Sequence, residues 1–420
     1  MNISRRDFLT RSSAAGVISI GATAPSLLNH AALSAEARGN TKNNKDRILV
    51  LIELAGGNDG LNTVIPFADD HYHKSRPGIR MDSNAVLKLD DYHGFHPQMT
   101  GMKSLYDAGH LAVIQGVGYP NPDRSHFRSM DIWHSAHPAD EEFRGDGWIG
   151  RALDQSHARH AGRVPAMAVG TERLPRALLG AKINVPLLRS LDAFQWDPGA
   201  GSKAEQKQRR ELIDAFAARP ATEGSTLDFL RKTTATASQT AKRLGDVTAA
   251  YQPAAEYPNN GLGRKLKTVA QLIAADLGTQ IFFVSLGGFD THSQQQGAHA
   301  ALLGELSSAL TAFHQDIQGK QLSDRVLMAT FSEFGRRVEE NGSLGSDHGS
   351  ASQMFIVTPG GSDARAGLIG KHPSLTDLDA NDDMKFHTDF RAVYATLLEK
   401  WLEIPSASAL GGKFTPMDFI

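Results

Sequence analysis

Aspartate and histidine, two residue types that bind divalent metal ions, occur together at two places in the second half of the chain. Asp290 and His292 are separated by one residue, so an extended backbone turns both side chains to one face, where they can share a metal ion. Asp347 and His348 are adjacent and point in opposite directions, which suits two ions about 3.5–4 Å apart, as in two-metal hydrolytic sites. A surface turn is the alternative interpretation of the second pair. We expect all four residues to be metal ligands.

Further segments carry side chains suited to the same chemistry. Asp59 and Glu333 offer carboxylates to a metal, and His387 offers another imidazole. The amide of Asn58 and the guanidinium of Arg336 could hold the non-bridging oxygens of an ester, because arginine binds oxyanions with two parallel hydrogen bonds. A ligand set without thiolate favours zinc or manganese, with magnesium or calcium as alternatives. An Asx-rich turn around Asp59 and a structural histidine at His387 are the competing interpretations.

Ser125 is the candidate nucleophile. It stands at the start of a predicted helix that runs to about residue 136. Its hydroxyl would lie near the positive end of the helix dipole, which favours a nucleophilic oxygen. Serine at a helix start is more often a simple cap, and Thr63 and Ser129 are alternative nucleophiles.

Most of these residues follow short apolar runs that predict β-strands. The first run is nearly continuous in leucine and β-branched residues, as expected for a strand covered on both faces. Helical periods separate several runs, and this alternation predicts an α/β fold with a largely parallel sheet, in which ligands bind at the carboxyl ends of the strands. The predicted strands are 48–54, 111–117, 164–169, 281–286, 326–331 and 354–357, and the clearest predicted helices are 262–277 and 302–317.

The composition of the chain predicts a helical insertion and bears on its partners and on disulfide bonds. Residues 202–256 are rich in Ala, Lys, Gln, Glu and Thr and predict helices without strands, which we interpret as a helical insertion in the same domain. The formal net charge of −2 is close to neutral and argues against a nucleic-acid partner. There are no cysteines, so no disulfide supports the fold, which must rely on core burial.

The N-terminal residues predict an export signal. The arginine pair Arg5 and Arg6 precedes an apolar stretch over 14–28, which is shorter than the about 20 residues that a membrane-spanning helix needs. A small-x-small cleavage site then predicts a signal peptide over 1–37 and a polar linker over 38–46. We expect the twin-arginine translocase to export the folded chain from a bacterial cytoplasm to the periplasm or beyond, with no stable membrane span after cleavage. A disordered basic N-terminus is the alternative.

Five motifs together carry a family resemblance. In chain order they are GGNDGLNT, SHF, FDTH, SEFGRR and DHG, at residues 56–63, 125–127, 289–292, 332–337 and 347–349. This set resembles a bacterial exported family known as domain of unknown function 1501, over nearly the whole of residues 47–420. That family in turn resembles the alkaline phosphatase and sulfatase superfamily, which implies a doubly wound sheet, an alkaline phosphatase-like domain over 47–420 and two metal ions at the strand ends.

The superfamily pattern implies roles for particular residues of this chain. It has a first-strand Asp, a Ser or Thr nucleophile at a helix start, an Asp/His pair, an Asp-His dyad and a late His. The matching residues are Asp59, Ser125, Asp290 with His292, Asp347 with His348, and His387. Glu53 stands at the strand end where the superfamily commonly has its first Asp. Formylglycine sulfatase chemistry is disfavoured, because the chain lacks cysteine and the nearest string, 75–80, puts its arginine one residue late.

Three functional hypotheses follow. The leading one is an exported metal-dependent hydrolase that acts on a small phosphate or sulfate ester through a two-metal site. The rival is a non-catalytic exported protein that keeps the fold and acts in surface assembly or binds a co-exported partner. A weaker alternative is a metal-dependent phosphomutase or phosphodiesterase of the same superfamily.

Overall fold

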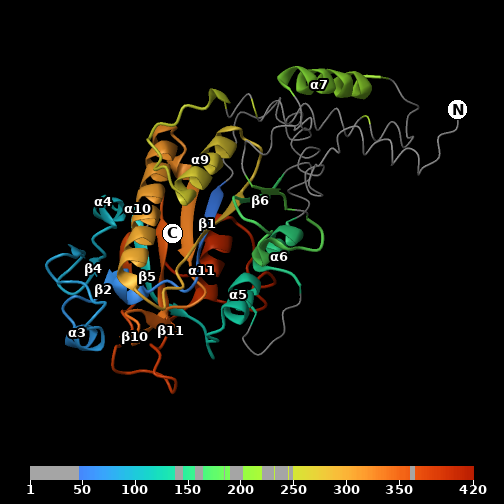
Figure 1. The fold of residues 1–420 in the computed structure, drawn as a ribbon. Coiled ribbons are helices and arrows are strands. Elements are labelled where there is room, and N and C mark those ends of the chain that lie inside the picture. Colours follow the sequence, from blue (N-terminus) through green and yellow to red (C-terminus); the bar gives the residue numbers. More distant parts are fainter. Residues whose placement is uncertain are drawn as a thin grey trace.

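A mixed, mostly parallel β-sheet forms the centre of the computed structural model, with helices on both faces (Figure 1). The structure describes residues 47–137, 145–156, 164–183, 185–189, 202–219, 231, 245, 249–359 and 365–420. Across the sheet the strands are β13 (Gly367–Ile369), β5 (Leu111–Gly118), β12 (Ser352–Val357), β9 (Val326–Phe331), β1 (Ile48–Ala55), β8 (Ile281–Gly287), β6 (Ala166–Val169) and β7 (Leu187–Leu188), and β14 (Thr388–Asp389) pairs with β5. The predicted α/β fold is confirmed.

Most neighbouring strands of the main sheet are parallel. β1 pairs in parallel with β8 and β9, and β6 pairs in parallel with β8 and β7. β12 is the exception, because it runs antiparallel to β5 and β9. A hairpin of β10 (Arg336–Glu340) and β11 (Ser346–His348) leads from β9 into β12, and an antiparallel neighbour needs no helical crossover.

Alternate residues of β1 face two separate hydrophobic cores. Val50 and Ile52 belong to the core on one face, and Leu49 and Leu51 belong to the core on the other. Neither face of the strand meets water, which explains the nearly continuous apolar sequence. The first core is covered by α4 (Thr100–Asp107), α9 (Gly261–Ala274) and α10 (Gln295–Gly319), and the second by α5 (His126–Ser135), α6 (Trp148–Gln155) and α11 (Phe390–Thr396).

The predicted helices are present with different bounds, since α9 ends at Ala274 and not at residue 277, and α10 begins at Gln295 and not at residue 302. Asn260 caps α9 by accepting a hydrogen bond of 2.7 Å from the amide of Gly263. Ser125 precedes α5, and Ala136 ends it in a left-handed conformation with φ of 57°. α5 and α10 therefore start at the same edge of the sheet, beyond the ends of β5 and β8.

The smaller elements lie around the main sheet. A second sheet contains β2 (Val64–Ile65), β4 (Gly94–Phe95) and β3 (Leu87–Lys88), and α3 (Asp70–Ser75) lies between β2 and β3 in the chain. α7 (Lys203–Ala217) falls in the segment 202–256, but residues 220–230, 232–244 and 246–248 lie outside the described residues, so the helical insertion stays a prediction. The signal peptide 1–37 and the linker 38–46 also lie outside them. Within the described residues, every helix is too short or too polar to cross a membrane.

Candidate metal centre

Three loops and the short strand β11 converge beyond the carboxyl ends of the central strands. Residues 288–294 follow β8, residues 332–335 follow β9 and residues 119–125 follow β5. β11 reaches the same edge because β12, which follows it, is antiparallel and starts there. Ligands of open α/β sheets bind at this edge.

Three side-chain atoms from these loops form a small triangle. Nε2 of His292 and Nε2 of His348 are 2.9 Å apart. Oδ1 of Asp290 lies 3.0 Å from the first nitrogen and 3.1 Å from the second. The ligand atoms around a tetrahedral zinc ion lie about 3.3 Å apart, given bond lengths of about 2.0–2.1 Å. The triangle therefore nearly matches one face of such a site, and it brings together three of the predicted ligands.

The hydrogen-bond partner of Nδ1, the ring nitrogen that points away from the triangle, shows which nitrogen of His292 and of His348 carries the proton. Nδ1 of His348 is 2.7 Å from the backbone carbonyl of Arg124, an atom that only accepts, so this nitrogen carries the proton. Nδ1 of His292 donates to Oδ1 of Asp347 at 3.1 Å. In the neutral rings both Nε2 atoms then present lone pairs to each other and to the Asp290 carboxylate. These lone pairs and the carboxylate repel one another, and a cation bound between them would remove the repulsion because all three atoms would become its ligands.

His126 is a further candidate ligand that the sequence analysis did not assign. Its Nε2 is buried, has no hydrogen-bond partner and lies 3.4 Å from Oδ2 of Asp290. The ligand atoms of His126, Asp290 and His348 all lie within 4.8 Å of one another. The signals in the sequence were its position directly after Ser125, at the start of the predicted helix, and its place in the SHF motif at 125–127.

Glu333, expected to be a ligand, instead stands behind His126. Its Oε1 accepts a hydrogen bond from the amide of Gly56 at 2.8 Å and lies 2.9 Å from Nδ1 of His126. The hydrogen bond to Glu333 raises the pKa of the His126 imidazole, against an opposite effect of burial. Asp347 has the equivalent place behind His292. Carboxylates that hold the outer nitrogen of a histidine are usual around protein metal ions.

The charge states of Asp290 and His348 suit a divalent cation. Burial would raise the pKa of Asp290, but the hydrogen bond and the positive charge of the Arg336 guanidinium lower it. Burial lowers the pKa of His348 below that of a free histidine. The carboxylate is thus ionised and the imidazole neutral at pH 7, and both are the forms that bind metal.

The structure does not bring Asp59 into this cluster. Its carboxylate is fully buried and forms an ion pair of 2.6 Å with Arg76. Oδ2 also accepts a hydrogen bond of 2.5 Å from Gln295, and Oδ1 caps the turn at residues 60–62. Burial would raise the pKa of Asp59, but Arg76 holds it below the usual value. Asp59 therefore stabilises the loop after β1, contrary to the expectation that it binds metal.

The two expected oxyanion donors also point into the protein. Asn58 is buried, and its amide donates a hydrogen bond of 3.0 Å to Thr63 and accepts one of 2.9 Å from His299. Arg336 has no exposed surface, and it supports the loops around the cluster. Its guanidinium donates to Asp290 and to the carbonyls of Gly56, Gly57, Phe289 and Ser346.

Ser125 lies next to the candidate metal ligands, whereas His387 lies outside them. Ser125 is exposed and makes no side-chain cap to α5, so its hydroxyl is accessible beside His126. His387 is also exposed, its backbone amide donates to the carbonyl of Gly116 in β5, and its ring lies near that glycine. The structure does not place it among the ligand atoms of His126, Asp290 and His348.

These residues define a histidine-rich candidate metal centre at the carboxyl edge of an α/β sheet. The chain belongs to the DUF1501 family, described as proteins of unknown function, whose model matches residues 46–403. A search of curated proteins finds no matching relative.

Several solved structures share similarity with the chain. A protein in the alkaline phosphatase superfamily from Vibrio parahaemolyticus is 8% identical with a TM-score of 0.37, covering 93% of this chain and 77% of that one. PsFucS1 sulfatase from Pseudoalteromonas sp. is 11% identical with a TM-score of 0.39, covering 94% and 74%. The C-terminal periplasmic domain of EcEptC from Escherichia coli, in complex with Zn, is 9% identical with a TM-score of 0.36, covering 75% and 74%. The ligand assignment rests on the residues of this chain alone.

Proposed function

We propose that His126, Asp290, His292 and His348 bind one divalent metal ion, and that the protein is a metal-dependent hydrolase of small phosphate or sulfate esters. The observation that carries this proposal is the arrangement of the imidazoles, whose outer nitrogens are bonded to oxygen while their inner nitrogens face Asp290. Three nitrogens and one carboxylate favour zinc or manganese over magnesium or calcium.

Ser125 is the nucleophile that the geometry supports best. Both of its neighbours in the chain contact the cluster, since the Arg124 carbonyl accepts from His348 and the His126 ring faces Asp290. Thr63 and Ser129 are buried, and their hydroxyls donate to backbone carbonyls. A bound divalent ion would lower the pKa of a hydroxyl or water and polarise the ester oxygen. The net reaction consumes water and releases an alcohol with phosphate or sulfate.

The sequence predicted two metal ions, and the proposal here is a single ion. Among the described residues, Asp290 and His348 share one cluster with the ligand atoms of both His126 and His292. Asp347, expected to serve a second ion, already accepts hydrogen bonds from Asn341 and His292. We therefore propose a stoichiometry of one ion per chain.

Metal analysis and turnover of p-nitrophenyl phosphate and sulfate test the proposal. The double variant His292→Ala/His348→Ala should lose both the bound metal and the activity of the wild type. The matched control His71→Ala/His387→Ala removes two exposed imidazoles that are outside the cluster and should retain both. Unchanged metal content in the first variant would exclude these ligands.

The inward orientation of Asn58 and Arg336 favours a second candidate, a non-catalytic exported protein that binds metal. Phosphate, sulfate or vanadate should raise the melting temperature of the metal-loaded protein if an ester oxyanion binds at the ion. Metal binding without turnover, and without any shift by these anions, would support the non-catalytic candidate.

Export by the twin-arginine translocase remains part of the proposal. The support is the arginine pair at Arg5 and Arg6 with the apolar stretch and cleavage site after it. Arg5→Lys/Arg6→Lys should keep the chain in the cytoplasm with an uncleaved N-terminus, as seen by fractionation and mass spectrometry. Normal export of this variant would argue for another route.

A further inference from the structure

The SHF motif at residues 125–127 ends in a residue to which the proposed function gives no role. Ser125 is the candidate nucleophile and His126 is a candidate metal ligand, and Phe127 follows them in the first turn of α5. Phe127 is 87% exposed, although an aromatic ring gains free energy by leaving water. An apolar ring exposed at this place is suited to contact a molecule that binds at the metal centre.

The geometry of α5 places this ring close to the candidate nucleophile. Side chains of an α-helix lean toward its N-terminus and cover the turn before their own Cα. Phe127 is the second residue of α5, so its ring leans toward the start of the helix, which Ser125 precedes. The His126 ring and the Arg124 carbonyl both contact the metal cluster. An ester that is bound at the ion and attacked by Ser125 would therefore have the Phe127 ring beside it.

A second exposed apolar side chain also borders the metal centre. The large apolar side chains that are strongly exposed among the described residues are Phe127, Leu212, Phe216 and Leu344. Leu212 and Phe216 belong to α7, which lies well apart from α5 and from the hairpin of β10 and β11 (Figure 1). Leu344 precedes Gly345, where a Cβ would lie 2.3 Å from the backbone of His292. The rim of the centre thus offers apolar contacts at two points.

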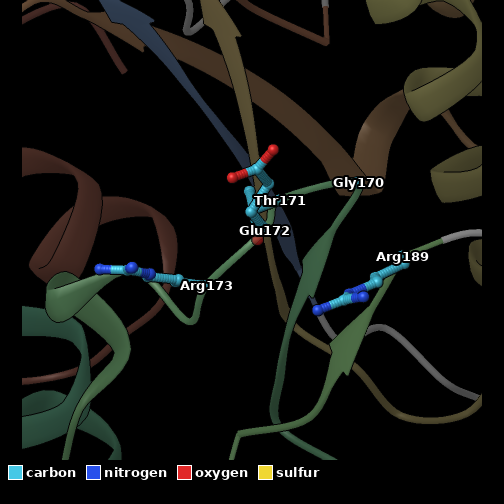
Figure 2. Close-up of a pocket in the computed structure, with 5 residues that line it drawn as sticks. All are labelled: Gly170, Thr171, Glu172, Arg173 and Arg189. Atoms are coloured by element: carbon cyan, nitrogen blue, oxygen red, sulfur yellow. The ribbon is translucent and has the colours of Figure 1, made fainter.

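A separate cleft at the ends of β6 and β7 does not offer such contacts. Its volume is about 420 Å³, and its lining consists of Gly170, Thr171, Glu172, Arg173 and Arg189. Figure 2 shows that the guanidinium groups of the two arginines do not converge. The lining has no aromatic or aliphatic residue, so a ring-bearing molecule finds its apolar contact at Phe127 and not in this cleft.

We propose that Phe127 is a specificity-determining residue, and that its ring packs against a flat ring carried by the leaving alcohol of the ester. This inference rests on the proposed function and names its substrate class, the phosphate or sulfate esters of ring-bearing alcohols. The ring is either an aryl group or a sugar, because each presents a flat face of carbon atoms. The net reaction consumes water and releases the ring-bearing alcohol with phosphate or sulfate.

Phosphonates resist hydrolysis and measure this contact on the metal-loaded full chain without turnover. The probes are benzylphosphonate, ethylphosphonate and the phosphonate counterpart of glucose 1-phosphate, together with the corresponding sulfonates. In calorimetric titrations the wild type should bind a ring-bearing probe about ten-fold more tightly than its ethyl counterpart. Whether the benzyl or the glucosyl probe binds more tightly identifies the ring. Phe127→Ala should lose this preference, while its metal content and its affinity for the ethyl probes change less than two-fold. Phe127→Tyr should keep the preference.

Two controls connect the preference to Phe127. Phe216→Ala removes an exposed aromatic ring from α7 and should change every affinity less than two-fold. Sedimentation of the wild type and of Phe127→Ala should give the same mass, and a smaller assembly in the variant would show that a second copy of the chain covers the ring, which would overturn the inference.

The failure of this inference differs from the failure of the proposed function. Ethyl probes that bind the wild type as tightly as ring-bearing probes, or a preference that persists in Phe127→Ala, would overturn this inference alone. A wild type that binds no probe would overturn it too, and the absence of ester turnover in the same protein would show that the proposed function has failed with it.

Discussion

At the scale of single residues, the structure separates side chains that face the candidate metal from those that hold them in place. Glu333 illustrates the second group, because it contacts His126 and not the centre of the cluster. Glu333→Ala should weaken metal binding about 10–100-fold, the usual effect of removing such a partner, as measured by chelator competition. Glu53→Ala removes a comparable buried partner of His134 outside the cluster and should leave metal affinity unchanged. Equal metal affinity in both variants would contradict the role of Glu333.

Asp59 should contribute to the stability of the fold and not to metal binding. Asp59→Ala would leave Arg76 buried and without its ion-pair partner, which should cost about 3–5 kcal/mol of unfolding free energy in urea titrations. The double variant Asp59→Leu/Arg76→Met should recover much of that loss, because no buried charge remains. Both proteins should still bind one metal ion, and loss of the ion from the folded double variant would restore Asp59 as a ligand.

Asp383 should make stability depend on pH. Burial, opposed by Arg124 and Arg337, raises its pKa to about 6. The folded state therefore favours the protonated acid, so this contribution is complete below the unfolded pKa of about 4 and is lost as pH rises to about 6. Asp383→Asn should gain stability relative to the wild type over this window, by up to about 3 kcal/mol. Urea midpoints at several pH values measure this gain, and exposed Asp91→Asn is the control. Parallel pH profiles for wild type and Asp383→Asn would contradict it.

At the scale of elements, the loop after β1 is packed directly against the loop that carries Asp290. A Cβ at Gly56, where φ is +120°, would lie 2.4 Å from the backbone nitrogen of Asp290. Gly56→Ala should therefore displace Asp290, reduce metal affinity and cost more than about 2 kcal/mol of stability. Gly109→Ala has a positive φ but nothing within 4 Å, so it should cost about 1 kcal/mol and keep the metal. Similar metal affinities in the two variants would refute this coupling.

At the scale of the whole molecule, the sequence predicted the strands and the edge of the sheet where the site would lie. Asp290, His292 and His348 were predictable because they lie near strand ends in short segments that contain glycine, with Gly288 before the first two and Gly349 after the third. Asp59 and Arg336 have the same local pattern, yet the structure turns them inward to pair with Arg76 and with backbone carbonyls. Local sequence shows which residues reach this edge, but the direction of each side chain depends on partners far along the chain.

The role of His126 as a candidate metal ligand was not predicted from the sequence, for a related reason. A histidine at a helix start is ordinarily structural, and its role here depends on Glu333, which is 207 residues away in the sequence. The antiparallel β12 was also unpredicted in direction, although it is this direction that brings His348 to the edge where β8 and β9 end. Such long-range pairings follow from the packed fold and leave no periodic signal in the sequence.

An anomalous difference map of metal-loaded crystals would locate the metal ion. We expect one peak per chain, about 2.0–2.2 Å from Oδ1 or Oδ2 of Asp290 and from Nε2 of His126, His292 and His348. A well-ordered crystal with its peak elsewhere, or with these four side chains uncoordinated at saturating metal, would contradict it.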